Sequence, residues 1–470
     1  MRMIVEAHLV DDDGCAERVQ LCTIDRPLTT DPLGMSLAEG KALLVAAQQH
    51  LVNGQCDGIA YEHAQCDHCQ ARLGLKGWHQ RQIKTVFGRI EVKSPRVRYC
   101  QCACRAPGAS FSPLALVVPT SMTPELEYLQ VKWAGHLSYA TATRLLSEVL
   151  PVADTISISG VKRRARVVGA ALKQAVSQNA QTHSDLQGRT ILAPPTSSSL
   201  TARAVDSGWL RHCDPPRHNG RHVNLVAGRA CFEGGKTRLY AYVHNQVPSA
   251  ATRLDRFLTD SGVGPNQRVT IFTDGAGEFE KAVNGASRPT CRILDWFHIA
   301  MKFRAIEQTA RKYPDMVTPN GRGLNDEIAS CKWLAWHGKA AKAVTRLKSI
   351  HDVLEEIPVL RDSALYLNLR HAWWYLRSNG RYLVNYGRRY YKGLPISSAI
   401  AESAVNEVVS WRMAKRRQMR WSDEGAHLLA QVRVHDLNGE LHPRAFAFPL
   451  RQQKPDRDRR KTLYSMRMAA

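Results

Sequence analysis

The sequence lacks any long apolar run. No segment approaches the roughly 18 consecutive apolar residues that a membrane-spanning helix needs. The first residues, MRMIVEAHLVDDDG, also lack the basic and apolar regions of a secretory signal peptide. We therefore expect an intracellular, cytoplasmic protein with no membrane partner.

The chain is also short of acidic residues. Its 42 Asp and Glu face 65 Lys and Arg, which gives a formal net charge of +23 over 470 residues. The basic residues gather in VKRRAR at 161–166, YGRRYYK at 386–392, WRMAKRRQMR at 411–420 and DRDRRK at 456–461. Any one cluster alone could equally be a solvated basic face that binds no partner. Several of them favour a polyanionic partner, and nucleic acid before a membrane surface.

Cysteines are plentiful near the N-terminus, and in an intracellular protein they indicate metal binding or packing rather than disulfides. Two groups stand out, CDHC and YCQCACR, with the segment RQIKTVFGRIEVKSPRVRY between them. That segment is typical of a β-hairpin around Gly88, which would bring the two groups together. We expect a zinc-ribbon-like module at 61–115, although unpaired reduced thiols are the alternative. The expected Zn²⁺ ligands are Cys66, Cys69, Cys100 and Cys102, with Cys104 as an alternative ligand.

The region 120–180 predicts two helices joined by a turn. SYATATRLLSEVL is amphipathic, Pro151 breaks it, and Ser157 or Ser159 would cap a second, basic helix. This pattern is typical of a helix-turn-helix whose second helix enters the major groove of DNA. A plain helical hairpin with a solvated second helix fits nearly as well.

Beyond a Ser-, Thr- and Pro-rich linker, three apolar runs each end in an aspartate. These are Asp206 in LTARAVDSGWLR, Asp274 in RVTIFTDGAGEF and Asp295 in RILDWFHIA. In an open α/β sheet the carboxyl ends of neighbouring strands form the ligand cleft, so the three residues could converge. Clustered carboxylates repel one another, and hard divalent cations such as Mg²⁺ remove that penalty. For any single aspartate, a role as a turn or helix-capping residue is a better explanation than a role as a metal ligand.

A further carboxylate comes from the helix predicted in GLPISSAIAESAVNEVVSWRMAKRRQMRW. Its apolar stripe has Glu402 on one flank and Glu407 on the other, about 140° apart. Only one of them can face a cleft, and periodicity does not say which.

In this order the motifs resemble those of DDE transposases of the Mutator-like superfamily, and more narrowly transposases of bacterial insertion sequences of the ISKra type. The resemblance runs from near Cys66 to about Gly439, and ISSAIAESAVN carries the glutamate. Two departures stand out. Ser207 separates Asp206 from a glycine that family members tend to have directly after the aspartate, and Cys104 is an additional cysteine.

The resemblance implies an α/β fold with an RNase H-like catalytic domain, an all-helical insertion within it, and a zinc-ribbon-like module and a helix-turn-helix DNA-binding region before it. The expected divisions are an N-terminal helical region at 1–60, the zinc-ribbon-like module at 61–115, the helix-turn-helix at 120–180, a linker at 181–199, the catalytic domain at 200–302 and 396–440, the insertion at 303–395 and a basic tail at 441–470.

The resemblance also implies a catalytic triad of Asp206, Asp274 and Glu402 that holds two Mg²⁺ or Mn²⁺ ions. These would cut a phosphodiester bond at each transposon end and let the freed 3′-hydroxyl attack target DNA. Asp295 and His298 match the family's motif of Asp or Cys, two residues and His, and His298 would position or protonate a group at the scissile phosphate. A hydrogen-bonded histidine at a helix start is the alternative.

The expected partner is double-stranded DNA, both transposon ends and target, bound by a homodimer or larger oligomer. No nucleotide cofactor is expected, since the energy comes from the exchanged phosphodiester and the sequence has no Walker-type loop. Phosphate contacts would make binding strongly salt-dependent. The residues expected to contact DNA are Lys162, Arg163, Arg164, Arg166, Arg412, Lys415, Arg416, Arg417 and Arg420.

Two other functions compete with this one. The first is an RNase H-like nuclease without strand transfer, and the second is a zinc-containing DNA-binding regulator that lost catalysis; retention of all three carboxylates and His298 counts against the second. Within the insertion, we expect the tryptophans to lie in the core, whereas the aromatic and basic stretch 386–392 could instead stack on unpaired bases. These tryptophans are Trp333, Trp336, Trp373 and Trp374.

Overall fold

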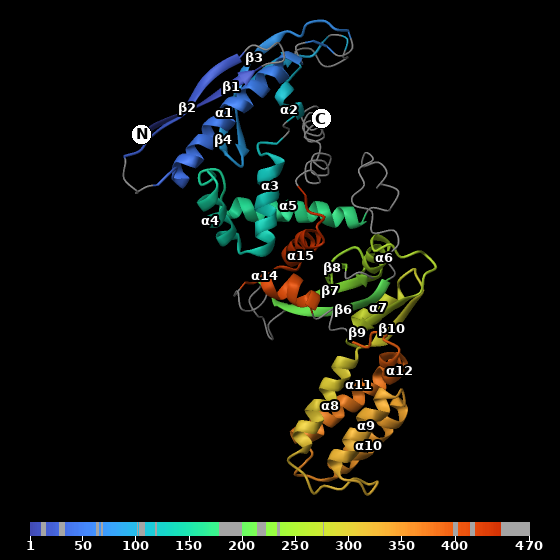
Figure 1. Cartoon of the computed structure of the whole chain (residues 1–470). Coiled ribbons are helices and arrows are strands. Elements are labelled where there is room, and N and C mark those ends of the chain that lie inside the picture. Colours follow the sequence, from blue (N-terminus) through green and yellow to red (C-terminus); the bar gives the residue numbers. More distant parts are fainter. Residues whose placement is uncertain are drawn as a thin grey trace, which may run out of the picture. The chain divides into compact units, whose positions relative to one another are not determined.

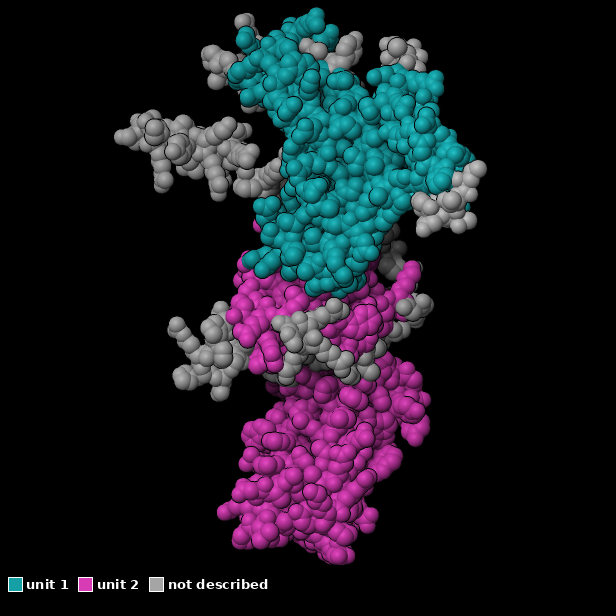
Figure 2. All heavy atoms as spheres, turned by 90° about the vertical axis from the view of Figure 1, so that its left-hand side faces the viewer, with its two compact units in different colours: residues 1–171, 441–470 teal, residues 172–440 magenta. Residues whose placement is uncertain are grey.

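The computed structural model has mixed α/β structure, and its chain divides into two compact units. One consists of residues 1–171 with 441–470 and the other of residues 172–440 (Figure 2). None of the described helices is long and apolar enough to cross a membrane. The residues described are 1–10, 16–27, 33–62, 65–66, 69–100, 102, 109–117, 120–177, 200–213, 222–232, 236–275, 277–397, 403–413 and 419–442.

The first unit begins with an antiparallel hairpin, β1 (Arg2–Val10) and β2 (Ala16–Asp25), followed by α1 (Leu37–Glu62). This corrects the expectation that residues 1–60 are helical throughout. In β1 the partly buried residues alternate with exposed ones from Ile4 to Val10, and this period of two suits a strand with one face covered. The helical expectation holds only for α1.

The hairpin expected around Gly88 is present. It consists of β3 (Leu75–Thr85) and β4 (Gly88–Arg98), and the short strand β5 (Ser110–Phe111) pairs with β4. Gly88 adopts φ +101°, a conformation that residues with a Cβ rarely take. One face of the hairpin is apolar and packs against α1 and α2 (Pro113–Val117) around Ile90.

Three helices follow, α3 (Pro124–His136), α4 (Tyr139–Val149) and α5 (Ile158–Ser177). The hydroxyl of Ser138 accepts a hydrogen bond from the Thr141 amide and caps α4. Ser157, one of the two expected caps, accepts one from the Gly160 amide at 3.1 Å. The pair of helices separated at Pro151 is thus as predicted.

The second unit is built on a five-stranded sheet in the order β10-β9-β6-β7-β8. Strand β7 pairs antiparallel with both β6 and β8, whereas β9 is parallel to both β6 and β10. Apolar residues of α6 and α7 cover one face, and those of the segment 403–413 and α15 cover the other. The elements are β6 (Leu200–Arg211), β7 (His222–Phe232), β8 (Thr237–Val243), α6 (Ala250–Asp260), β9 (Val269–Thr273), α7 (Gly277–Asn284), β10 (Thr290–Leu294) and α15 (Asp423–Leu437).

The region expected as an all-helical insertion is helical, and its first helix begins at Trp296 rather than after residue 302. The helices share a core that also includes Phe272 of β9 and Leu294 of β10, so they pack against this end of the sheet (Figure 1). They are α8 (Trp296–Ala310), α9 (Leu324–Trp336), α10 (Ala340–Glu356), α11 (Ala364–Ser378) and α12 (Tyr386–Tyr391).

The expectation that the tryptophans of this region lie in the core is half wrong. Trp336 and Trp373 pack against the core, but the side chains of Trp333 and Trp374 are 61% and 59% exposed. Trp373 and Trp374 are consecutive and project about 100° apart around α11, so only one of them faces the core. Trp333 and Trp336 lie about 60° apart on one face of α9, so their spacing does not predict that Trp333 is exposed. In the aromatic stretch 386–392, Tyr386 is buried and Tyr391 is exposed.

Candidate functional site

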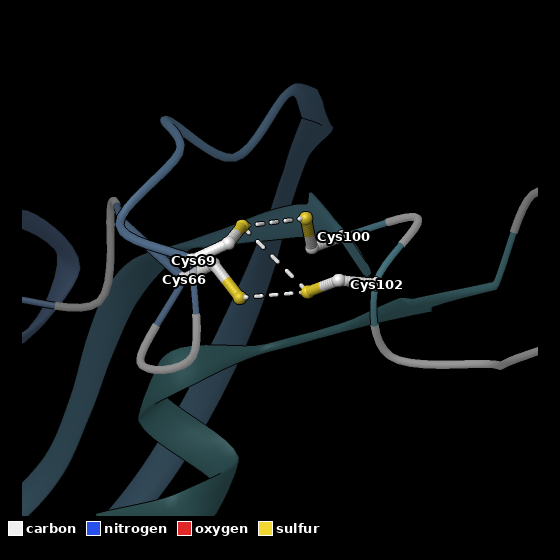
Figure 3. A group of neighbouring side chains, drawn as sticks. All are labelled: Cys66, Cys69, Cys100 and Cys102. Carbon is white, nitrogen blue, oxygen red and sulfur yellow. Dashed lines mark hydrogen bonds between the residues drawn. The ribbon is translucent and has the colours of Figure 1, made fainter.

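Four cysteines meet at one end of the β3–β4 hairpin (Figure 3). The sulfur of Cys69 lies 3.3 Å from that of Cys100 and 3.6 Å from that of Cys102, and the Cys66 and Cys102 sulfurs are 3.5 Å apart. A tetrahedral zinc site with Zn–S bonds of about 2.3 Å has sulfurs about 3.8 Å apart, so the cluster is close to this geometry. It could bind a metal such as zinc.

Local backbone structure positions the first pair of thiols. The Cys66 carbonyl accepts a hydrogen bond from the Gln70 amide at 2.8 Å, and the Cys66 amide donates to the Ala71 carbonyl at 2.9 Å. Gln70 takes the left-handed conformation with φ 59°, which closes this tight turn. The second pair follows directly from the end of β4. Cys104, the alternative ligand, lies outside the described residues.

The thiols of the cluster ionise unequally. Contacts with the sulfurs of Cys100, Cys66 and Cys69 raise the pKa of Cys102 well above its usual range. A hydrogen bond from the Cys102 amide, together with the thiols of Cys69 and Cys102, lowers the pKa of Cys100. A bound divalent cation removes this inequality because it stabilises every thiolate at once.

The three aspartates fall at neighbouring positions of the sheet, but only Asp274 and Asp295 follow the ends of their strands. Asp206 lies within β6, opposite Ala227 of β7, which corrects the expectation that it ends its strand: the strand continues to Arg211 because it pairs with β7 over that length. In the parallel pairing of β6 with β9, Ala204 lies opposite Phe272, and Asp206 and Asp274 each follow two residues later. In the pairing of β9 with β10, Thr273 lies opposite Leu294, which directly precedes Asp295. The backbone positions of the three residues are therefore side by side on adjoining strands. The side chain of Asp206 is not among the described groups.

The turn after Asp274 requires glycine. Gly275 has φ +95°, and a Cβ there would lie 3.0 Å from Cε2 of Tyr375 and 3.1 Å from Cδ1 of Leu294. Neither the conformation nor the space allows a larger residue without a shift. The next element, α7, begins at Gly277.

Asp295 and His298 form a hydrogen-bonded pair at the start of α8. The Asp295 carboxylate is fully buried and accepts two bonds, from the Phe297 amide and from Nδ1 of His298, each at 2.8 Å. The second bond assigns the proton of the neutral imidazole to Nδ1 and makes Nε2 its acceptor atom. Because the His298 side chain is 35% exposed, its ring is accessible to solvent, while the hydrogen bond to the buried Asp295 carboxylate fixes its orientation.

Two residues of the helical region also contact this end of the sheet. The Tyr375 hydroxyl donates to the carbonyl of Asp274 at 2.6 Å, and the Lys302 ammonium lies 4.5 Å from the centre of the Tyr375 ring. Burial lowers the pKa of Lys302, and the charge of Asp274 partly counteracts that effect. Burial raises the pKa of Tyr375, and the charges of Asp274 and Asp295 raise it further.

Sequence reasoning missed both of these residues. Lys302 lies four positions after His298 and so shares its face of α8, which is a signal that could have identified it. Tyr375 comes from α11, and no local pattern links it to Asp274.

The expected third carboxylate, Glu402, lies outside the described residues. The alternative residue, Glu407, forms an ion pair with Arg229 of β7. The arginine neutralises this carboxylate and so competes with a metal ion for it. Glu407 lies in a π-helical turn, Asn406–Ser410, a feature that often occurs near functional sites. This helical segment packs closely on β6 at Gly208. A Cβ added to Gly208 would lie only 3.1 Å from Cγ1 of Val405, so a larger residue would require a shift.

The residues expected to contact DNA differ in their surroundings. Lys162, Arg163 and Arg166 are exposed on α5, while Arg164 is half-buried and pairs with Glu127 of α3 at 3.0 Å. Arg420 is exposed. The remaining residues, Lys415, Arg416 and Arg417, lie outside the described part of the chain.

The expectation that Arg412 contacts DNA is wrong, because this residue is buried. Its side chain is fully buried, stacks over Trp421 with 5.5 Å between the guanidinium carbon and the ring centre, and donates to the sulfur of Met419 at 2.9 Å. Position 412 faces the core that the segment 403–413 shares with α15, so the guanidinium group contacts protein side chains there.

No protein-family model matches the chain, and no curated protein matches it significantly.

Proposed function

We propose that the protein is a DDE-type DNA transposase of an insertion sequence, of the ISKra type within the Mutator-like superfamily. It binds the terminal inverted repeats, cuts the DNA at the transposon ends and joins those ends to target DNA. The observation that carries this proposal is the side-by-side position of Asp206, Asp274 and Asp295 at adjoining strands of a mixed five-stranded sheet. The helical region that follows Asp295 supports an RNase H-like domain with an insertion.

The donor set suits a hard divalent cation. Asp206 and Asp274 would hold Mg²⁺ or Mn²⁺, and Glu402 would complete the set by resemblance. Two such ions, when bound, activate the attacking water or 3′-hydroxyl and stabilise the charge that develops on the phosphate. Glu407 is the weaker choice for the third ligand, since Arg229 already neutralises it.

The chain's own residues supply orientation. Asp274 is held by the tight turn at Gly275 and by the Tyr375 hydroxyl on its carbonyl. Asp295 orients the His298 ring, so that Nε2 can accept a hydrogen bond from water or a hydroxyl group at the scissile phosphate. Phosphodiester exchange conserves the bond energy, and the reaction requires no nucleotide cofactor.

DNA binding is assigned to the first unit. The four-cysteine cluster would hold a structural Zn²⁺ ion that fixes the end of the β3–β4 hairpin, because such ions contribute directly to folding in small modules. α5, the second helix of the pair, would enter the major groove, and its exposed basic residues would contact phosphates. Bringing two transposon ends together requires a dimer or a larger assembly.

The decisive experiment incubates the purified protein and Mg²⁺ or Mn²⁺ with a plasmid that carries the native DNA flanking its gene. Asp206→Asn, Asp274→Asn and Glu402→Gln are tested in parallel. Asp315→Asn, which changes an exposed carboxylate beyond α8, serves as the matched control. We expect cleavage at the ends and joined products with the wild type and the control, and neither with the three site variants.

Other outcomes point to other functions. Cleavage without any joined product would indicate an RNase H-like nuclease. DNA binding that is equal in the wild type and all variants, with no cut after host extract is added, would indicate a zinc-containing DNA-binding regulator.

A further inference from the structure

Lys302 occupies an unusual position for a lysine. It projects from α8 one helical turn after His298, its side chain is half-buried, and its ammonium lies over the ring of Tyr375 at 4.5 Å. The same tyrosine donates its hydroxyl proton to the carbonyl of Asp274 at 2.6 Å. One aromatic ring therefore contacts both the lysine and the backbone of the strand-end aspartate.

The positive charge of Lys302 and the carboxylate of Asp274 attract each other. Ordinary surface pairs of this kind contribute little, because water screens them and both side chains are mobile. Here burial reduces the screening, and stacking on Tyr375 restrains the long side chain. The ammonium group thus stands near the carboxylate to which a divalent cation would have to bind.

We propose that Lys302 lowers the affinity of Asp274 for a divalent cation, because its ammonium group, held beside the site by Tyr375, repels a cation that binds this carboxylate. The inference rests on the proposed function to the extent that Asp274 is a metal ligand. Lys302 then sets the metal concentration at which the site loads. The residue acts on the metal through its charge and does not itself bind the ion.

The test measures Mn²⁺ binding to the purified, zinc-loaded full-length protein without DNA, by the loss of the free-ion electron paramagnetic resonance signal. Lys302→Met and Lys302→Gln remove the charge, and Lys302→Arg retains it. Lys312→Met changes an exposed lysine just beyond the same helix and is the matched control. Circular dichroism and thermal unfolding show which variants are folded.

We expect both neutral variants to bind Mn²⁺ on the order of tenfold more tightly than the wild type. Lys302→Arg and Lys312→Met should bind as the wild type does. The gain should vanish when Asp274→Asn is added to Lys302→Met, because the carboxylate that binds the cation is then absent. A purely structural role would predict weaker binding in the neutral variants.

Two results would overturn the inference, and they separate it from the proposed function. If Asp274→Asn abolishes Mn²⁺ binding but the folded neutral variants bind no more tightly than the wild type, only the role of Lys302 is refuted. If Mn²⁺ binding is the same with and without Asp274, the metal site itself is refuted, and the role of Lys302 with it.

Discussion

Replacing Asp295 by asparagine isolates the role of the buried carboxylate beneath His298. Asparagine caps helices as well as aspartate does, and its side-chain oxygen can still accept the Phe297 amide, so α8 should remain intact. What is lost is the charge-assisted hydrogen bond from Nδ1 of His298, 2.8 Å long. Bonds of this kind contribute about 1.5–3 kcal/mol.

If that free energy is used to orient His298 in the transition state, its loss lowers the rate of end cleavage by roughly 10- to 150-fold. The side-chain NH₂ group introduced by Asp295→Asn would also turn a donor towards Nδ1, which favours the tautomer with its proton on Nε2. The histidine would then present a donor where it had presented an acceptor.

The rate is measured as single-turnover cleavage of a plasmid carrying the native ends, for Asp295→Asn, His298→Ala and the double variant. We expect the double variant to be no slower than His298→Ala alone, since the carboxylate acts through the ring. Nitrogen NMR of histidine-labelled protein reports the tautomer independently of activity. A wild-type rate in Asp295→Asn, or an equal further loss when it is added to His298→Ala, would refute this reasoning.

Further predictions concern the fold, the DNA surface and the cysteine cluster. Gly275→Ala should lower the free energy of unfolding by about 2 kcal/mol in thermal denaturation, whereas Gly321→Ala, which shares a positive φ but has open space around it, should cost only about 1 kcal/mol. Lys162→Ala should reduce the slope of log affinity against log salt by about 1, while Arg412→Ala should leave that slope unchanged and instead destabilise the protein. Zinc affinity, followed by competition with a chelator, should rise with pH and fall on acidification, because the raised pKa of Cys102 means that its thiol must release a proton when metal binds. Affinity independent of pH would argue against thiolate ligation.

Much of the local structure follows from the sequence alone. The hairpin at Gly88, the caps at Ser138 and Ser157 and the CDHC turn each depend on interactions between residues a few positions apart. Their signals lie in the choice of Gly, Ser and Cys at fixed offsets. The same holds for the Asp295–His298 pair, which spans a single helical turn.

Periodicity alone was a weaker guide where it had to specify which face is buried. The helical pattern around Trp333 and Trp374 did not reveal that both are exposed, and the basic run at 411–420 concealed the burial of Arg412. In each case the neighbouring element decides the outcome, because a helix presents several faces and only packing selects one. The strand in the first ten residues differs from the helical expectation for another reason: a strand that is only partly buried on one face needs only a weak alternation of apolar residues.

The amino-acid sequence by itself determined the residue types that could do chemistry here: aspartates that follow apolar runs, a histidine one helical turn beyond the last of them, and paired cysteines. Only the tertiary structure decided which of them are neighbours. Strands β6 and β9 adjoin although β7, β8 and α6 separate them along the chain, and that pairing alone sets Asp206 beside Asp274. Lys302 and Tyr375 reach the same place because α8 and α11 pack together against the ends of β9 and β10. Such contacts arise from the burial of apolar surface between distant segments, and no local pattern encodes them.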